Sequence, residues 1–68
     1  MTATEMQTGP REVYLAARRS GWSHEHARLH AAHCYGFHLG SRDSASALDR
    51  RLAGAPEEFN DEMKGRAA

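Results

Sequence analysis

Apolar and polar residues along this chain follow the period of an α-helix rather than that of a β-strand. No stretch alternates between polar and apolar residues for more than a few positions, so the sequence has no strand signal. The fold class that we predict is all-α, a small bundle of three or four short helices around a central helix near residues 23–39. The expected helical segments are 11–20, 23–39, 45–52 and 57–64.

Residues that favour helix ends delimit these segments. Pro10 suits the first helical position, where its missing N–H breaks no hydrogen bond. Ser23 suits the N-cap of the central helix, because its hydroxyl can accept from a backbone N–H in the next turn. Gly40 suits the left-handed residue just past the end of that helix.

A chain of 68 residues holds one domain at most, and a single core is only marginally sufficient at this size. We expect that domain at residues 10–64, between a disordered tail at residues 1–9 and a frayed end at residues 65–68. Large apolar side chains are sparse, so the predicted core is thin. A partner chain, expected to be a second copy in a homodimer, or a bound metal would add stability.

The segment from Ser23 to Leu39 contains all five histidines and the lone cysteine, Cys34. At about 100° per residue, three imidazoles fall in one narrow sector of the helix, and Phe37 lies among them. Cys34 lies at the edge of that sector. This grouping predicts, as an alternative function, a zinc-binding helical protein with these ligands: His26, His30, His33 and Cys34.

Several features that are typical of a complete zinc site are missing from the sequence. There is no Cys-x-x-Cys pair and no second ligand-rich segment, and one helix seldom completes a tetrahedral shell. A second copy of the helix in a dimer would complete it. Alternatively, the histidines are exposed polar residues on an interface helix, and Cys34 is a small buried apolar residue.

The chain from Ala17 onward has a small residue, a glycine four positions later, an apolar residue and then a serine. This pattern resembles the turn of bacterial helix–turn–helix regulators, whose second helix enters the major groove of DNA. The resemblance implies a second alternative, DNA binding through residues 14–30. It departs from the family at Trp22, which is bulky, and at His30, where an apolar residue is usual. The implied DNA contacts are Arg18, Arg19, Ser23, His24 and Arg28.

Charge argues against strong attraction to nucleic acid, because nine basic residues balance nine acidic ones. Most arginines precede residue 43 and most carboxylates follow it, which suits head-to-tail contacts between chains or a solvated surface. No apolar run approaches the roughly 20 residues of a membrane span. One cysteine and the lack of a signal-peptide pattern favour a reducing, cytoplasmic location.

The sequence contains no nucleotide-binding or catalytic motif, so the favoured class is a non-enzymatic protein-interaction module. Small, nearly neutral chains rich in arginine and alanine include regulators and inhibitors encoded by phages and mobile elements, and we group this chain with them by analogy. Aromatic anchors and small-residue strips on the central helix predict contact with another protein. The predicted interface residues are Trp22, Ala27, Ala31, Tyr35 and Phe37.

Overall fold

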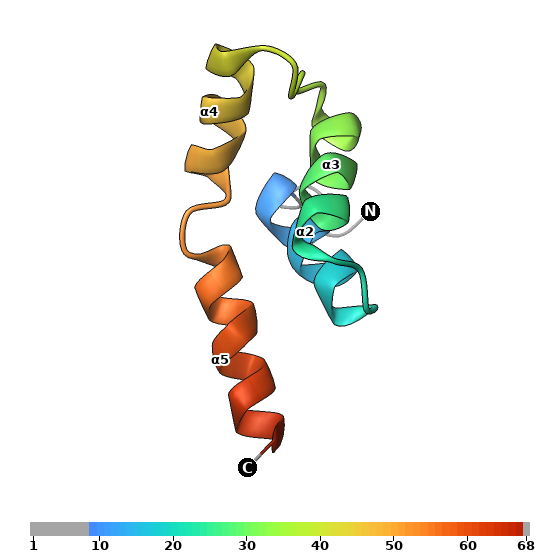
Figure 1. Ribbon diagram of the computed structural model, residues 1–68, viewed down its shortest axis with the longest axis vertical. Helices are drawn as coiled ribbons and strands as arrows, with labels where there is room; N and C mark the ends of the chain where they lie inside the picture. The colour runs from blue at the N-terminus through green and yellow to red at the C-terminus, as the bar shows by residue number, and fades with distance from the viewer. Residues whose placement is uncertain (1–8, 68) are drawn as a thin grey trace, which may run out of the picture.

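A computed structural model describes residues 9–67 of the chain (Figure 1). Within that range the regular structure is entirely helical, so the predicted all-α fold is confirmed. Apart from Gly9, the expected N-terminal tail lies outside the described residues, as does Ala68. The helices are α2 (Pro10–Arg19), α3 (His24–Tyr35), α4 (Arg42–Arg51) and α5 (Ala55–Ala67).

The predicted helix starts at Pro10 and Ser23 are confirmed. Pro10 is the first residue of α2, and the carboxylate of Glu12 accepts the N–H of Gly9 at 2.9 Å. Ser23 is the N-cap of α3, and its Oγ accepts the N–H of His26 at 3.2 Å. Both starts depend on contacts within one turn, which is why they can be recognised in the sequence.

Helix α3 ends at Tyr35, so the predicted end at Gly40 is one turn too late. Gly36 adopts a left-handed conformation with φ of 76°, which glycine enters without the clash that a Cβ would cause. The N–H of Phe37 then donates to the carbonyl of Ala32 at 2.9 Å and closes the end of the helix.

The last two helices are longer than expected. Helix α4 starts at Arg42 because Ser41 caps it, and the Oγ of Ser41 accepts the N–H of Ser44 at 3.5 Å. Helix α5 starts at Ala55, just after Gly54, and continues to Ala67. The expected boundary at residue 64 therefore falls inside a helix.

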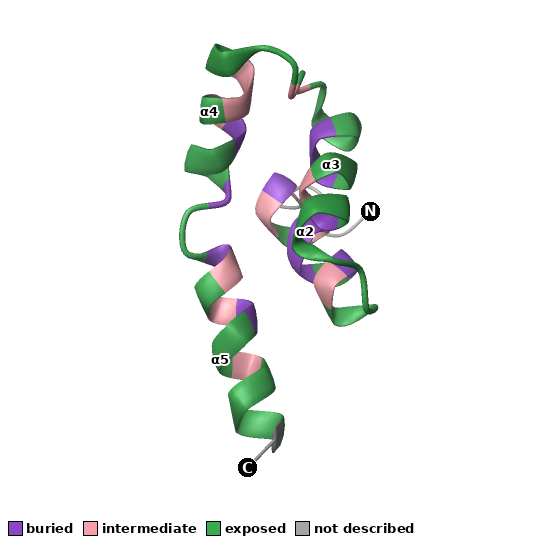
Figure 2. Cartoon of the chain, viewed as in Figure 1, coloured by how far each residue is buried: buried purple, intermediate pink, exposed green. Residues whose placement is uncertain are grey.

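Helix α2 packs against each of the other three helices, most extensively against α3 and then against α5. Figure 1 shows α4 and α5 following one another along one side of the molecule, with α2 and α3 on the other side. The buried residues lie on the sides of the helices that face between these two halves (Figure 2). The hub of the fold is thus α2, while the histidine-rich α3 covers one of its sides.

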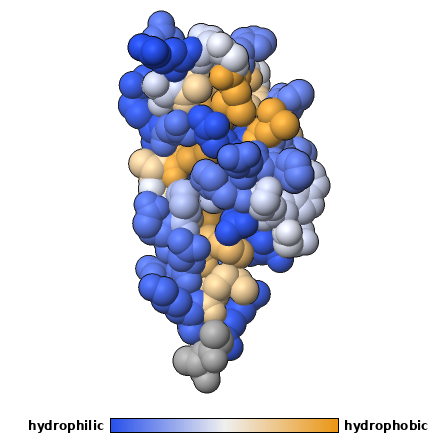
Figure 3. Space-filling model, in the orientation of Figure 1, coloured by the Kyte–Doolittle hydropathy of each residue, from blue (hydrophilic) through white to orange (hydrophobic). Residues whose placement is uncertain are grey.

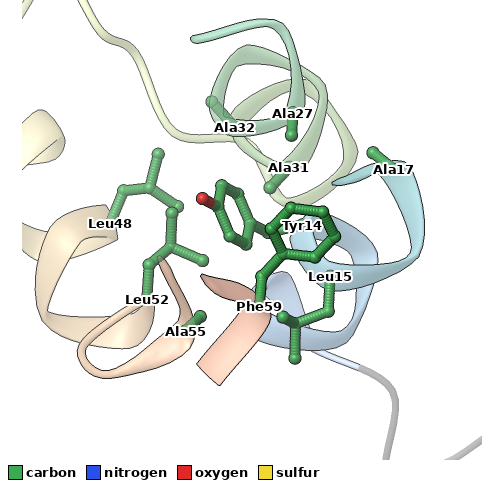
Figure 4. Close-up of a cluster of buried hydrophobic side chains, with 10 residues drawn as sticks. All are labelled: Tyr14, Leu15, Ala17, Ala27, Ala31, Ala32, Leu48, Leu52, Ala55 and Phe59. Carbon is green, nitrogen blue, oxygen red and sulfur yellow. The ribbon is translucent and has the colours of Figure 1, made fainter. Parts of the chain in front are cut away.

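The core is small and centres on Tyr14, which is 1% exposed (Figure 4). On one side of its ring are three alanines of α3, and on the other are side chains from α4 and α5. The alanine methyl groups allow α2 and α3 to approach closely, and Tyr14 fills the space toward α4. The buried hydrophobic residues of the core are Tyr14, Leu15, Ala17, Ala27, Ala31, Ala32, Leu48, Leu52, Ala55 and Phe59.

Three arginine–carboxylate pairs join the two halves at the surface. Two of them link α2 to α5: Arg11 to Glu58 at 3.0 Å and Arg19 to Glu62 at 2.6 Å. The third links α3 to α4, from Arg28 to Asp49 at 2.9 Å. The uneven distribution of charge along the sequence therefore produces contacts within the chain.

Candidate functional site

Helix α3 turns its alanines toward the core and its histidines toward solvent. Ala27, Ala31 and Ala32 are fully buried. Around the same helix, the opposite face carries exposed residues at the spacing of successive turns. These are His26, Leu29, His30 and His33.

Trp22 lies at the N-terminal end of this outer face and is 45% exposed. Its ring centroid is 5.0 Å from that of His30, with the planes tilted by 56°. Leu29, 43% exposed, borders the same shallow hollow of about 300 Å³. We call the residues that line this hollow the Trp22 face: Trp22, His26, Leu29, His30 and His33.

Two further hollows flank the Trp22 face. One of about 310 Å³ lies between α2 and α3, where Val13 and Ala16 face Trp22 and His30. The other, of about 450 Å³, lies where α3 leads into α4 and is lined by Leu29, His33, Gly36–Gly40 and Ala32. Figure 3 shows hydrophobic surface at this α3–α4 connection, within a largely hydrophilic face. Apolar surface is thus available at both ends of the Trp22 face.

The predicted interface residues separate into two groups. Trp22 and Tyr35 are exposed, and Phe37 is half-buried at the end of α3. Ala27 and Ala31 are instead covered completely by the chain's own core. The expectation that these two alanines face another protein is therefore corrected, because α2 already occupies the surface that they offer.

All three arginines proposed as DNA contacts are engaged inside the chain. Arg18 donates to the carbonyl oxygen of Trp22 at 2.8 Å, and its guanidinium lies 4.4 Å from the ring centroid of Phe59. Arg19 and Arg28 hold carboxylates of α5 and α4. Binding to DNA phosphates would require breaking these contacts, which lowers the electrostatic gain on which such binding depends.

The other two proposed DNA contacts, Ser23 and His24, also have partners in the fold. The Ser23 hydroxyl caps α3. Nδ1 of His24 is 2.9 Å from the hydroxyl of Tyr14, and the two rings meet edge to face. Burial raises the pKa of Tyr14, so its hydroxyl stays protonated and can donate to the imidazole.

The four predicted metal ligands do not converge. Within residues 9–67, no group of three or more His, Cys, Asp or Glu side chains is placed to hold one metal ion. One pair does lie close together, with 3.8 Å between Sγ of Cys34 and Nε2 of His30. Cys34 is a free, exposed thiol, so the expectation that it is buried is wrong.

The fold and the Trp22 face define a small all-α protein with an exposed aromatic and histidine surface. No family model matches the chain, and neither a curated protein nor a solved structure matches it. In the described part of the chain, no helix has both the length and the apolar character of a membrane span.

Leu29 is the residue of the Trp22 face that the sequence did not indicate. It has the helical spacing of a core position relative to Ala32, and a leucine in a helix is usually buried. In the structure the alanines occupy the core side, and Leu29 lies on the outer side. Its position three residues after His26 and four before His33 is the only signal that it shares their face.

Proposed function

We propose that this protein is a non-enzymatic protein-interaction module that binds another protein chain through the Trp22 face. The observation that carries the proposal is the exposure of Trp22 and Leu29 around one hollow. In a chain with so small a core, these large apolar side chains would contribute stability if buried, yet the fold leaves them at the surface. Buried aromatic anchors of this kind dominate the energy of many interfaces.

The composition of the face indicates the chemistry of its partner. Trp22 and Leu29 suit apolar side chains, and the hollow between α2 and α3 suits an apolar side chain of a helix that docks beside them. The imidazoles of His26, His30 and His33 can donate to carboxylates or carbonyls at the rim. We therefore expect a partner surface that places apolar side chains against Trp22 and Leu29 and polar groups against the imidazoles.

Two subsidiary features belong to the same proposal. A regulator or inhibitor acts by occupying a surface of its target, which a face without a deep cleft can do. The free thiol of Cys34 suits a reducing, cytoplasmic environment, where exposed thiols persist.

Truncation of the anchor tests the proposal. Trp22→Ala should weaken partner binding by at least about 30-fold, since truncated anchors at interface centres cost about 2 kcal/mol or more. Met63→Ala is the matched control, because Met63 is 42% exposed but lies on α5. Affinity is measured by calorimetry with the partner identified by site-specific photo-crosslinking from position 22. Equal crosslinking from positions 22 and 63, or equal affinity of the two variants, would contradict the proposal.

A further inference from the structure

Cys34 and His30 lie one turn apart on α3 with their ligand atoms facing each other. Sγ of Cys34 is 3.8 Å from Nε2 of His30, and both side chains are exposed. In a tetrahedral zinc site, Zn–S and Zn–N bonds of about 2.3 and 2.0–2.1 Å place sulfur and nitrogen about 3.6 Å apart. The pair therefore has nearly the spacing of one edge of a zinc coordination shell.

Within residues 9–67, one copy of the chain supplies only this edge. His26 and His33 share the outer side of α3, but no three potential ligands among residues 9–67 are grouped around one point. A structural zinc ion takes four protein ligands. The pair is thus half of such a shell, and the described part of the chain does not supply the other half.

We propose that His30 and Cys34 form half of a Cys₂His₂ zinc site that the same two residues of a second copy complete. This inference rests on the function proposed above, and it identifies the partner as a second copy of the chain. The zinc ion that the two copies would share is called the zinc joint. A twofold axis through the metal makes the two contributions identical, as a closed dimer requires. Helix α3 then crosses its symmetry mate near residues 30–34.

Charge supports this ligand set. On zinc binding, each Cys34 thiol releases its proton to solvent, and the two thiolates balance the two positive charges of the ion. His30 ligates through unprotonated Nε2 while Nδ1 carries the ring proton. The joint is therefore electrically neutral, which suits a position beside the apolar side chains of Trp22 and Leu29.

Trp22 also restrains one of the ligands. Its indole lies against the ring of His30, at 5.0 Å between centroids, and limits the rotation of the imidazole. Groups outside the coordination shell commonly orient metal-binding histidines in this way. The same residue that anchors the proposed interface thus holds Nε2 toward Cys34.

Native mass spectrometry of the full chain tests the zinc joint. The chain is stripped with EDTA and then titrated with zinc ions. We expect a monomer in EDTA and, with zinc, a dimer containing one ion per two chains. Cys34→Ser and His30→Asn should each abolish the zinc-dependent dimer, whereas His38→Asn, at an exposed histidine outside the Trp22 face, should retain it. Far-UV circular dichroism verifies that each variant remains folded.

Cobalt(II) provides a second readout that is independent of oligomeric state. Cobalt bound at the site should show thiolate-to-metal charge-transfer absorption, and Cys34→Ser should abolish it. One zinc per monomeric chain, or zinc binding that survives Cys34→Ser, would overturn the proposal. A chain that stays monomeric and zinc-free would overturn it too, while crosslinking from position 22 still decides the protein-interaction function separately.

A dimer that persists in EDTA and in Cys34→Ser separates the two proposals. It overturns the zinc joint. If Trp22→Ala dissociates that dimer, the Trp22 face remains the interaction surface and only the metal is excluded. If Trp22→Ala leaves the dimer intact, the Trp22 face is not the surface that joins the chains either.

Discussion

Ala31 illustrates how closely the helices of this small protein approach each other. It is fully buried between Ala27 and Ala32 of the same helix and the ring of Tyr14 on α2. A methyl group fills the available space, and anything larger has to displace Tyr14 or separate α2 from α3. The alanines of α3 therefore act as core residues, although their size gives little hydrophobic stabilisation individually.

Enlarging this position should destabilise the fold itself. Ala31→Leu inserts three carbons into a packed interior, which typically costs about 1–3 kcal/mol. Ala31→Arg should cost more, because it also buries an unpaired charge. Urea unfolding followed by circular dichroism measures both changes. Ala16→Leu is the control on the exposed side of α2, where the cost should stay within about 0.5 kcal/mol. Similar midpoints for Ala31→Leu and Ala16→Leu would contradict this packing.

At the scale of elements, Gly36 determines the length of α3 and the course of the chain after it. Its left-handed conformation ends the helix and turns Phe37 back onto the core. The N–H of His38 then donates to the Oγ of Ser44 at 2.7 Å, which ties the connection to α4. The hollow at the end of α3 is a consequence of this turn.

Gly36→Ala should therefore destabilise the protein by about 1–2 kcal/mol, since a Cβ is strained in the left-handed conformation. No neighbouring atom lies within 4 Å of the added carbon, so the cost comes from the backbone alone. Gly40→Ala is the matched control, because Gly40 is equally open but has no positive φ. Thermal unfolding compares the two variants, and an equal effect would show that Gly36 does not require its conformation.

At the scale of the whole molecule, α5 is attached to α2 mainly through side chains at the surface. Phe59 packs under the guanidinium of Arg18, and Glu58 and Glu62 hold Arg11 and Arg19. Among the described residues of α5, only Ala55 and Phe59 are buried. Charge pairing therefore matters more for the position of α5 than for that of α3, which packs through its alanines.

Acid should loosen this attachment. The hydrogen bond from Arg19 lowers the pKa of Glu62 below its ordinary value of 4.5. The folded state thus favours the charged carboxylate, so its contribution to stability is present above pH 4.5 and is lost as pH falls through the lowered pKa. Glu62→Gln should lower stability at pH 7 but have little further effect at pH 2–3. Asp61→Asn, exposed on the same helix, is the control in the same denaturation series.

Added salt gives an independent check on the same contact. Arg19 and Glu62 are partly exposed, so mobile ions should screen their attraction. In the natural chain, the backbone amides of α5 should exchange hydrogen faster at high salt than at low salt. The difference between the two salt concentrations should be smaller in Glu62→Gln. Salt-independent exchange of α5 would show that Phe59 and Ala55 suffice to hold it.

The sequence by itself determined the helical class of this protein and the starts of α2 and α3. Periodicity, a proline at the first helical position and a serine cap act within one or two turns, so they operate before any tertiary contact forms. The helical period of the sequence also placed His26, His30 and His33 on one face of α3. The sequence did not determine that α3 ends at Gly36 and not at Gly40, because either glycine can terminate a helix.

Only the tertiary structure decided which faces became core and which became surface. Whether Ala31 is buried depends on Tyr14, and whether Arg11 is paired depends on Glu58, 47 residues away. Such contacts arise from how whole helices dock, which a pattern within one segment does not specify. The same docking left Trp22 and Leu29 outside the core and brought arginines of α2 and α3 to carboxylates of α4 and α5. The Trp22 face is therefore the side of α3 that stays exposed because the alanines of α3 pack against α2.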